Sequence, residues 1–120
     1  IPGVKKLSEN IEAISIVDKY LEHARVLIFC NSGNEKIYLT SADWMFRNFD
    51  QRNETAVPIY DPKIRQELKT ILNIQFSDNT KARVLDKNQS NIYKLAAPDQ
   101  KKIRAQDEIY SFYKNQLTNR

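Results

Sequence analysis

The sequence contains few of the residues from which common nucleotide and metal sites are built. Its only two glycines, Gly3 and Gly33, are too few for a Walker phosphate-binding loop or a glycine-rich dinucleotide motif. Its single histidine and single cysteine, His23 and Cys30, argue against a zinc site built from this chain alone. One cysteine cannot form an internal disulfide, which is typical of proteins in a reducing compartment.

Long apolar segments are absent as well. The longest apolar run is far too short to span a bilayer, and the first residues lack the apolar core of a signal peptide. The sequence begins with Ile1 instead of methionine, so we expect a piece of a longer protein. Its 120 residues suffice for one compact domain. The 19 basic and 15 acidic residues give a net charge of +4, which favours an anionic partner only weakly.

The first half of the sequence predicts strands. Residues 25–30 are rich in Val, Ile and Phe, which predicts a buried strand. The turn-forming residues 31–34 follow, and residues 36–40 predict the hairpin partner of that strand. Residues 54–60 predict a third strand, in which Pro58 indicates a sheet edge or a bulge.

The second half predicts helices. Asp61 followed by Pro62 is typical of a helix start, and the helix is expected to continue to about residue 77. Residues 82–95 are polar and loop-like with short extended pieces, whereas residues 99–117 predict a second helix. Residues 11–21 fit either a strand or a short helix. The first helix has a stripe of apolar residues on one face: Ile64, Leu68, Ile71 and Leu72. Strands followed by helices indicate an α/β or α+β domain.

His23 and Arg25 stand two residues apart at the start of the first predicted strand. Side chains two apart on a strand point to the same side, so these two are expected to project together. An imidazole can relay a proton, and a guanidinium beside it can hold phosphate oxygens, which suits phosphoryl transfer. The alternative is a boundary histidine paired with Glu22, with Arg25 on a solvated face.

Two further polar groups follow the second predicted strand. Ser41 and Asp43 place a hydroxyl and a carboxylate at one point, or else cap a helix that begins nearby. Residues 47–54 contain two arginines among amides, which suits a polyanion, although such a run is usually a solvated, ion-paired loop. Four neighbouring side chains are predicted to be core instead of a base-stacking platform: Trp44, Met45, Phe46 and Phe49.

Four sequence segments together resemble the C-terminal end of bacterial polyphosphate kinases. They read SIVDKYLEHARVLIF, NSGNEKIYLTSADWMFRNFDQR, VPIYDP and IQFSDNTKAR. The resemblance extends from Ile1 to about Arg83, and the tail after Arg83 is not diagnostic.

The resemblance implies a phospholipase D-like α/β (α+β) domain, with a mixed sheet flanked by helices and a C-terminal helix. It implies a single domain over residues 1–120, made of a connector (1–10), a core (11–83) and a loop with the C-terminal helix (84–120). It further implies part of an enzyme that reversibly transfers the terminal phosphate of ATP to inorganic polyphosphate. The phosphohistidine of that reaction is expected on an upstream domain absent here, so the isolated chain should be inactive.

The resemblance also implies roles for particular residues. His23 matches a family histidine that lies beside the nucleotide phosphates and acts as an acid or base. Arg25 takes the lysine position of the HxK motif, and Glu54 is expected to orient the opposing histidine. Cys30 stands where that motif normally has an aspartate, which leaves open what orients His23. The residues expected to bind phosphate or ATP are His23, Arg25, Ser41, Asp43, Arg47 and Arg52.

The expected partners follow from the same family. They are ATP or ADP and inorganic polyphosphate as substrates, Mg²⁺ with ligands outside this chain, upstream domains of the same enzyme, and further copies in a homo-oligomer. Nucleic acid is not expected, and the expected location is cytoplasmic, with peripheral membrane association. Two alternatives stay open: half of a phospholipase D-type phosphodiesterase, and a non-catalytic polyphosphate-binding or assembly module in which His23 is inert.

Overall fold

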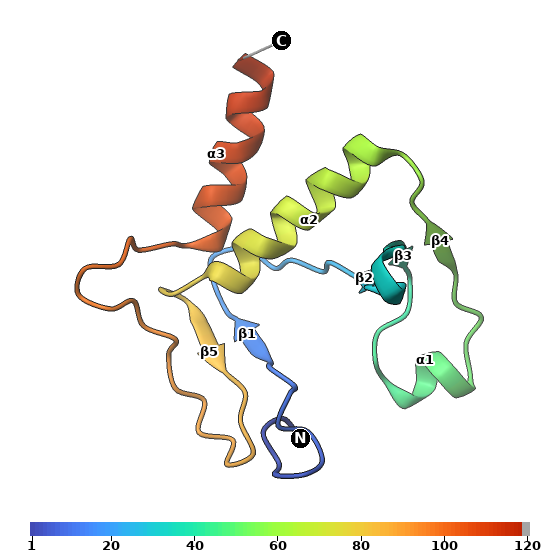
Figure 1. The fold of residues 1–120 in the computed structure, drawn as a ribbon, viewed down its shortest axis with the longest axis horizontal. Coiled ribbons are helices and arrows are strands. Elements are labelled where there is room, and N and C mark those ends of the chain that lie inside the picture. Colours follow the sequence, from blue (N-terminus) through green and yellow to red (C-terminus); the bar gives the residue numbers. More distant parts are fainter. Residues whose placement is uncertain (119–120) are drawn as a thin grey trace. The chain divides into compact units, whose positions relative to one another are not determined.

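The computed structural model describes residues 1–118, which form five strands, three α-helices and one 3-10 turn (Figure 1). The last two residues of the predicted C-terminal segment 84–120 lie outside the described residues. The chain divides into two compact units: residues 22–70, and residues 1–21 together with the chain from residue 71 onward. None of the described helices is both long and apolar enough to cross a membrane.

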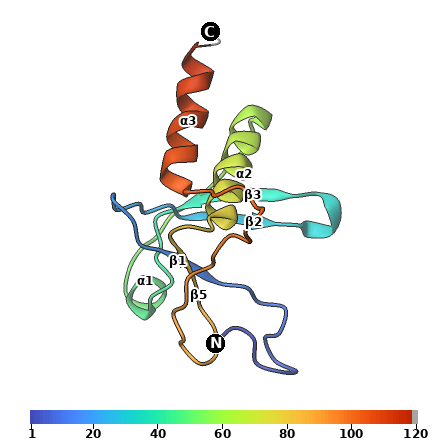
Figure 2. The same ribbon diagram turned by 90° about the vertical axis from the view of Figure 1, so that its left-hand side faces the viewer.

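The unit of residues 22–70 contains a three-stranded antiparallel sheet in the order β2-β3-β4. Strands β2 (Val26–Phe29) and β3 (Lys36–Thr40) form the predicted hairpin, as Figure 2 shows. The 3-10 turn η1 (Asn31–Gly33) joins them with three successive positive φ angles, of which the last falls on Gly33. The third strand is β4 (Ala56–Pro58); it pairs only with β3, so Pro58 lies on an edge strand as predicted.

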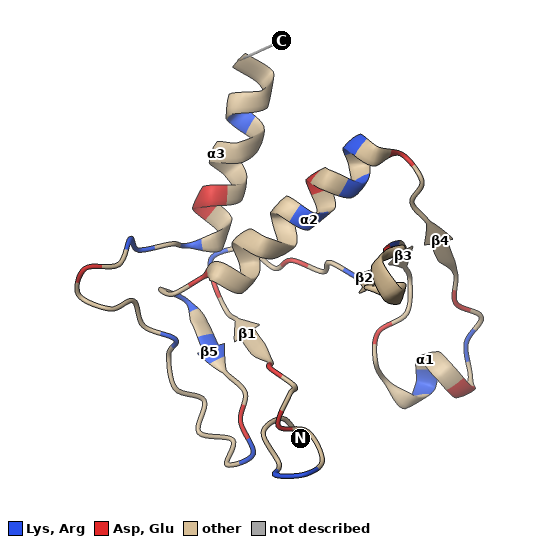
Figure 3. Ribbon diagram, in the orientation of Figure 1, with Lys and Arg blue, Asp and Glu red and all other residues tan. Residues whose placement is uncertain are grey.

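Helix α2 (Pro62–Ser77) begins at the predicted proline. Asp61 Oδ1 accepts hydrogen bonds from the backbone N–H groups of Lys63 at 2.7 Å and Ile64 at 3.2 Å. This carboxylate satisfies two of the N–H groups that a helix start leaves unpaired. Basic and acidic residues both line the first half of α2 (Figure 3).

Two burial predictions for this unit were wrong. Strand β2 is only half-covered, and Phe29 at its end is 52% exposed. The predicted apolar core after β3 is exposed too, with Trp44 at 81% and Phe46 at 76%. Phe46 is the first residue of the short helix α1 (Phe46–Asp50), and Trp44 lies two residues before it; no second layer of the unit's described residues covers these side chains.

The second unit contains a two-stranded sheet, helix α3 and the last turns of α2. Strand β1 (Ile14–Ile16), within the ambiguous segment 11–21, pairs antiparallel with β5 (Ala82–Val84). Helix α3 (Ala105–Thr118) begins six residues later than the predicted position 99. The α/β class is thus confirmed, but all described strands pair antiparallel in two sheets, where one mixed sheet was predicted. The reason is that the turns reverse the chain between β2, β3 and β4, and β5 runs back along β1.

Asp78 explains where α3 begins. Its side chain is fully buried, and Oδ1 accepts from the backbone N–H groups of Thr80, Lys81 and Ala82 at 2.7–3.0 Å. Oδ2 accepts from the N–H of Ala105 at 2.7 Å, at the first residue of α3. Burial alone would raise the pKa of Asp78, but these four backbone donors outweigh it and lower the pKa.

We expect the substitution Asp78→Asn to lower the free energy of unfolding by about 2–3 kcal/mol, because it leaves buried donors without a strong acceptor. Urea denaturation measures the loss, and Asp99→Asn, at an exposed loop carboxylate, serves as the control with little change.

The same substitution should change how stability depends on pH. Because the pKa of Asp78 is lowered in the fold, its contribution is present above the unfolded carboxyl value of about 4 and disappears as the pH falls through the lower folded value. The urea midpoint of Asp78→Asn should therefore fall less on acidification than that of the unsubstituted protein. An equal fall in both would contradict this role.

Candidate functional site

The β2–β3 hairpin brings three of the predicted site residues together at one end of the three-stranded sheet: His23, Arg25 and Asp43. The N–H of Thr40 donates to the carbonyl of Arg25 at 3.0 Å, which extends the ladder one residue past the start of β2. Thr40 Oγ1 then accepts from the N–H of Ala42 at 3.1 Å, which turns the chain after β3. As a result, Asp43 lies beside the segment that carries His23 and Arg25.

These three side chains form one bonded cluster. Asp43 Oδ1 accepts from Arg25 Nε at 2.7 Å and lies 2.7 Å from His23 Nε2. Arg25 Nη2 lies 3.2 Å from His23 Nδ1. A neutral ring with its proton on Nε2 satisfies both contacts, because Nε2 then donates to Asp43 and Nδ1 accepts from Arg25.

The charges in this cluster support one another. The Arg25 guanidinium, followed by the His23 ring, lowers the pKa of Asp43 to about 2. Hydrogen bonding to Asp43 in turn raises the pKa of Arg25. The His23 side chain is 61% exposed, against 28% for Arg25 and 25% for Asp43. A largely exposed ring held from one side by a carboxylate can meet a ligand on its open side.

The geometry also shows which carboxylate contacts His23. Sequence spacing pointed to position 30, where Cys30 follows the far end of β2 and is exposed. The carboxylate that contacts the ring comes from Asp43, 20 residues further along the chain. A strand pairing was needed to bring it there, so the local HxK-like spacing could not indicate it.

A second polar group lies next to the first. Ser41 Oγ donates to Glu54, and the N–H of Thr55 donates to Ser41 Oγ at 3.0 Å. Asn48 Nδ2 donates to the other oxygen of Glu54 at 2.6 Å. These bonds, first from Ser41 and then from Asn48, lower the pKa of Glu54. The carboxylate of Glu54 is therefore held ionised and in one orientation.

Sequence reasoning missed Asn48. Its side chain is 3% exposed although it stands between the exposed Phe46 and Phe49, and its Oδ1 is buried without a partner among the described residues. The signal that could have found it is a single amide within an aromatic segment, because a buried amide needs a polar partner.

The structure does not bring every predicted residue into these groups. Arg47 and Arg52 are exposed, and no hydrogen bond of the described residues joins either side chain to Asp43 or Glu54. Trp44 and Phe49 contact each other edge to face, with ring centroids 5.9 Å apart. The described residues also contain no group of three or more His, Cys, Asp or Glu side chains that could hold a metal ion.

Comparison with known proteins gives a consistent family. The family model described as polyphosphate kinase C-terminal domain 2 matches residues 1–106. A polyphosphate kinase of Escherichia coli is 51% identical over 115 residues, which is 96% of this chain and 17% of that protein. One of Vibrio parahaemolyticus is 49% identical over 115 residues, which is 96% of this chain and 16% of that protein.

Structural comparison agrees. The crystal structure of polyphosphate kinase from Porphyromonas gingivalis matches with a TM-score of 0.89 and 45% identity, over 94% of this chain and 17% of that one. These matches confirm the resemblance and the phospholipase D-like fold class predicted from the sequence. The chain spans about one sixth of the length of the curated relatives it matches.

We expect Arg25→Ala to raise the pKa of Asp43 more than His23→Ala does, because the bond from Arg25 is the larger cause of the lowering. In the unsubstituted protein the carboxyl carbon of Asp43 should show the chemical shift of the ionised form down to about pH 3, one unit above the pKa. Carbon-detected NMR titration of the three proteins measures this order. A larger effect of His23→Ala would contradict it.

Proposed function

Because the chain belongs to the polyphosphate kinase C-terminal domain 2 family, we propose that it forms one wall of the active site of a polyphosphate kinase. Such an enzyme reversibly transfers the terminal phosphate of ATP to inorganic polyphosphate. The observation that carries the proposal is the bonded cluster of His23, Arg25 and Asp43, within sequence segments that match the family. In phosphoryl transfer the protein mainly positions groups and stabilises charge, which this cluster is suited to do.

Arg25 is the phosphate-binding residue of the cluster in this proposal. Asp43 occupies its Nε, and Nη2 reaches His23, which leaves the Nη1 amino group to meet a phosphate oxygen. Within the proposed phosphate-binding set, Asp43 acts by holding Arg25 and His23, because an ionised carboxylate repels a phosphate. The exposed guanidinium groups of Arg47 and Arg52 provide further contacts with phosphate. The Ser41 hydroxyl, whose one proton goes to Glu54, contacts phosphate only when that bond is exchanged for one to a phosphate oxygen.

His23 is the proposed acid or base. When a phosphate oxygen takes over Nη2 of Arg25, Nδ1 of His23 is released, while Nε2 stays on Asp43. The released nitrogen then takes up a proton from solvent and donates it to the leaving phosphate, or uses it to hydrogen-bond the phosphohistidine carried by another domain; in the reverse direction the neutral nitrogen takes the proton back. Glu54, held by Ser41 and Asn48, orients the opposing histidine of that domain.

The remaining parts of the proposal concern the intact enzyme. Mg²⁺ bound to the ATP phosphates would neutralise part of their charge, and its protein ligands are expected in parts of the enzyme outside this chain. Other domains of the same enzyme complete the site, so the isolated chain is inactive. The enzyme is a cytoplasmic homo-oligomer, either free or associated with the membrane surface, and nucleic acid is not among its ligands.

We expect His23→Ala in the full-length enzyme to lower ATP-dependent polyphosphate synthesis by about 10²–10⁴-fold, the range for loss of an acid or base. Glu22→Gln, at the exposed neighbouring carboxylate, is the matched control and should keep near-normal synthesis. Normal synthesis by His23→Ala, together with salt-sensitive polyphosphate binding, would instead support the non-catalytic module. Phosphodiester hydrolysis by the intact protein would support the phosphodiesterase alternative.

Substitutions of Asp43 and Arg25 should change different kinetic constants of the enzyme. Asp43→Asn keeps the shape of the side chain but removes the charge that balances the cluster, so kcat should fall while KM for ATP changes little. Arg25→Ala removes a phosphate contact and should raise KM as well. Steady-state kinetics of both variants in the full-length enzyme test this difference, and identical profiles would contradict the separate roles.

A further inference from the structure

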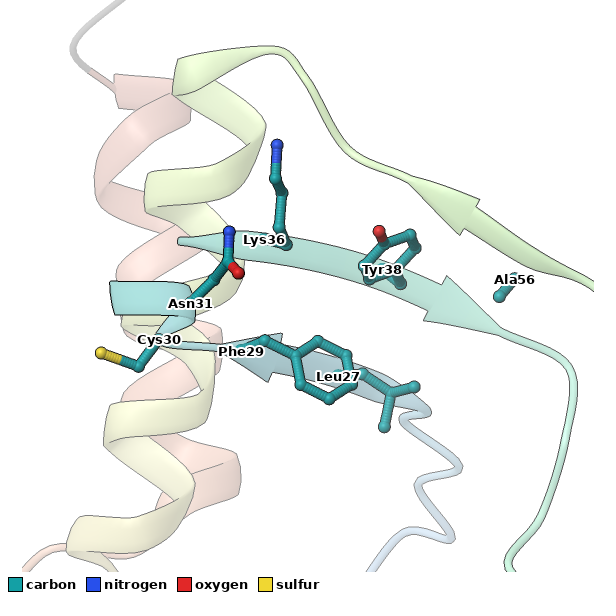
Figure 4. A pocket seen from close by; sticks show the side chains of 7 residues that line it. All are labelled: Leu27, Phe29, Cys30, Asn31, Lys36, Tyr38 and Ala56. Atoms are coloured by element: carbon teal, nitrogen blue, oxygen red, sulfur yellow. The ribbon is translucent and has the colours of Figure 1, made fainter. Parts of the chain in front are cut away.

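One side of the three-stranded sheet is apolar and open. The register places Leu27 opposite Tyr38 and Phe29 opposite Lys36, so these four side chains lie on the same side. Ala56 is on this side too, because it pairs with Thr40, two residues after Tyr38. These five residues define what is termed the open face. Figure 4 shows their side chains around a hollow of about 560 Å³.

The opposite side of the same sheet already has a cover. Glu35 and Ile37 point to that side, one position out of phase with Lys36. Arg65 of α2 lies 3.4 Å from a carboxylate oxygen of Glu35, and Lys69 lies 3.0 Å from the other. The first half of α2 therefore lies on this side, and Ile37 is only 2% exposed.

The sequence of β2 indicates that the open face is also buried in the intact protein. A strand with one solvated side alternates apolar and polar residues, whereas Val26–Phe29 is apolar at every position. Phe29 is nevertheless 52% exposed, and the hollow beside it is lined mainly by apolar side chains. A layer that the described residues of this unit do not supply is needed on this side.

We propose that this layer is another part of the same polyphosphate kinase polypeptide, outside these 120 residues, with an apolar surface and a carboxylate that meets Lys36. The curated relatives align with 96% of this chain, yet the aligned part is only 16–17% of their length, so ample further chain exists in such an enzyme. The proposal rests on family membership and on the proposed sharing of the active site with other domains, and not on any activity of His23.

Continuity with the candidate site favours the same polypeptide over a second copy. Arg25, Leu27 and Phe29 are alternate residues of one chain segment, so the open face ends at the guanidinium that contacts Asp43. A segment on the open face therefore borders the cluster from Arg25 outward. The part of an enzyme that completes a shared site has to meet this chain at that border.

Thiol labelling of the full-length enzyme tests the proposal. In a Cys30→Ser background, Phe29→Cys places one thiol on the open face, and Gln66→Cys places another at an exposed position of α2. N-ethylmaleimide labelling of each peptide is followed by mass spectrometry and normalised to the rate in denatured enzyme. We expect Phe29→Cys to react at least about tenfold more slowly in the native than in the denatured enzyme, and clearly more slowly than Gln66→Cys.

Dilution of the enzyme until the oligomer dissociates distinguishes a cover from the same polypeptide from a cover by a second copy. Protection of Phe29→Cys that persists when the oligomer is dissociated into monomers supports a cover from the same polypeptide. Protection that disappears on dissociation would assign the face to a second copy and overturn the proposal. Labelling at the denatured rate would overturn it as well, because the face would then be open in the intact enzyme. Leu27→Cys repeats the measurement in the middle of the face should Phe29→Cys fold poorly.

Discussion

The register of the β2–β3 hairpin is the constraint on which the candidate site depends. One backbone bond, from Thr40 N–H to the carbonyl of Arg25, fixes which residues stand opposite each other beyond the start of β2. A slip of one residue would turn Arg25 to the other side of the sheet and separate it from Asp43. The cluster is therefore a product of strand pairing, and the turn at Asn31–Gly33 that sets the pairing is part of the site's construction.

In both units a carboxylate accepts several hydrogen bonds, but with different consequences. In one, a single oxygen of Asp43 is shared between Arg25 and His23, in a position where the ring is still exposed. In the other, Asp78 is buried and its two oxygens accept four backbone N–H groups, which holds the start of α3 beside the turn after α2. Exposure makes the difference: a buried carboxylate with all its donors satisfied holds structure, whereas a partly exposed one leaves groups available to a ligand.

Local signals in the sequence predicted the elements whose causes are local. Three predictions follow from the properties of neighbouring residues, and the structure confirms them. They are the strand at residues 36–40 as hairpin partner of the first strand, the helix cap at Asp61 and the edge position of Pro58. The start of α3 was predicted too early, because the residue that sets it, Asp78, lies 27 positions away. Burial of Trp44 was wrong for a related reason, since burial depends on a second layer that composition cannot supply.

The sequence by itself determined the family and the α/β class, and it supplied the residues that are proposed to bind phosphate, because these depend on residue types and their spacing. It also indicated that His23 and Arg25 share one side of a strand. Only the tertiary structure decided that Asp43 contacts the ring, that Ser41 and Asn48 fix Glu54, and which apolar side of the sheet stays open. These outcomes depend on pairings between distant segments, whose geometry is set by the whole packed chain and not by any local run of residues.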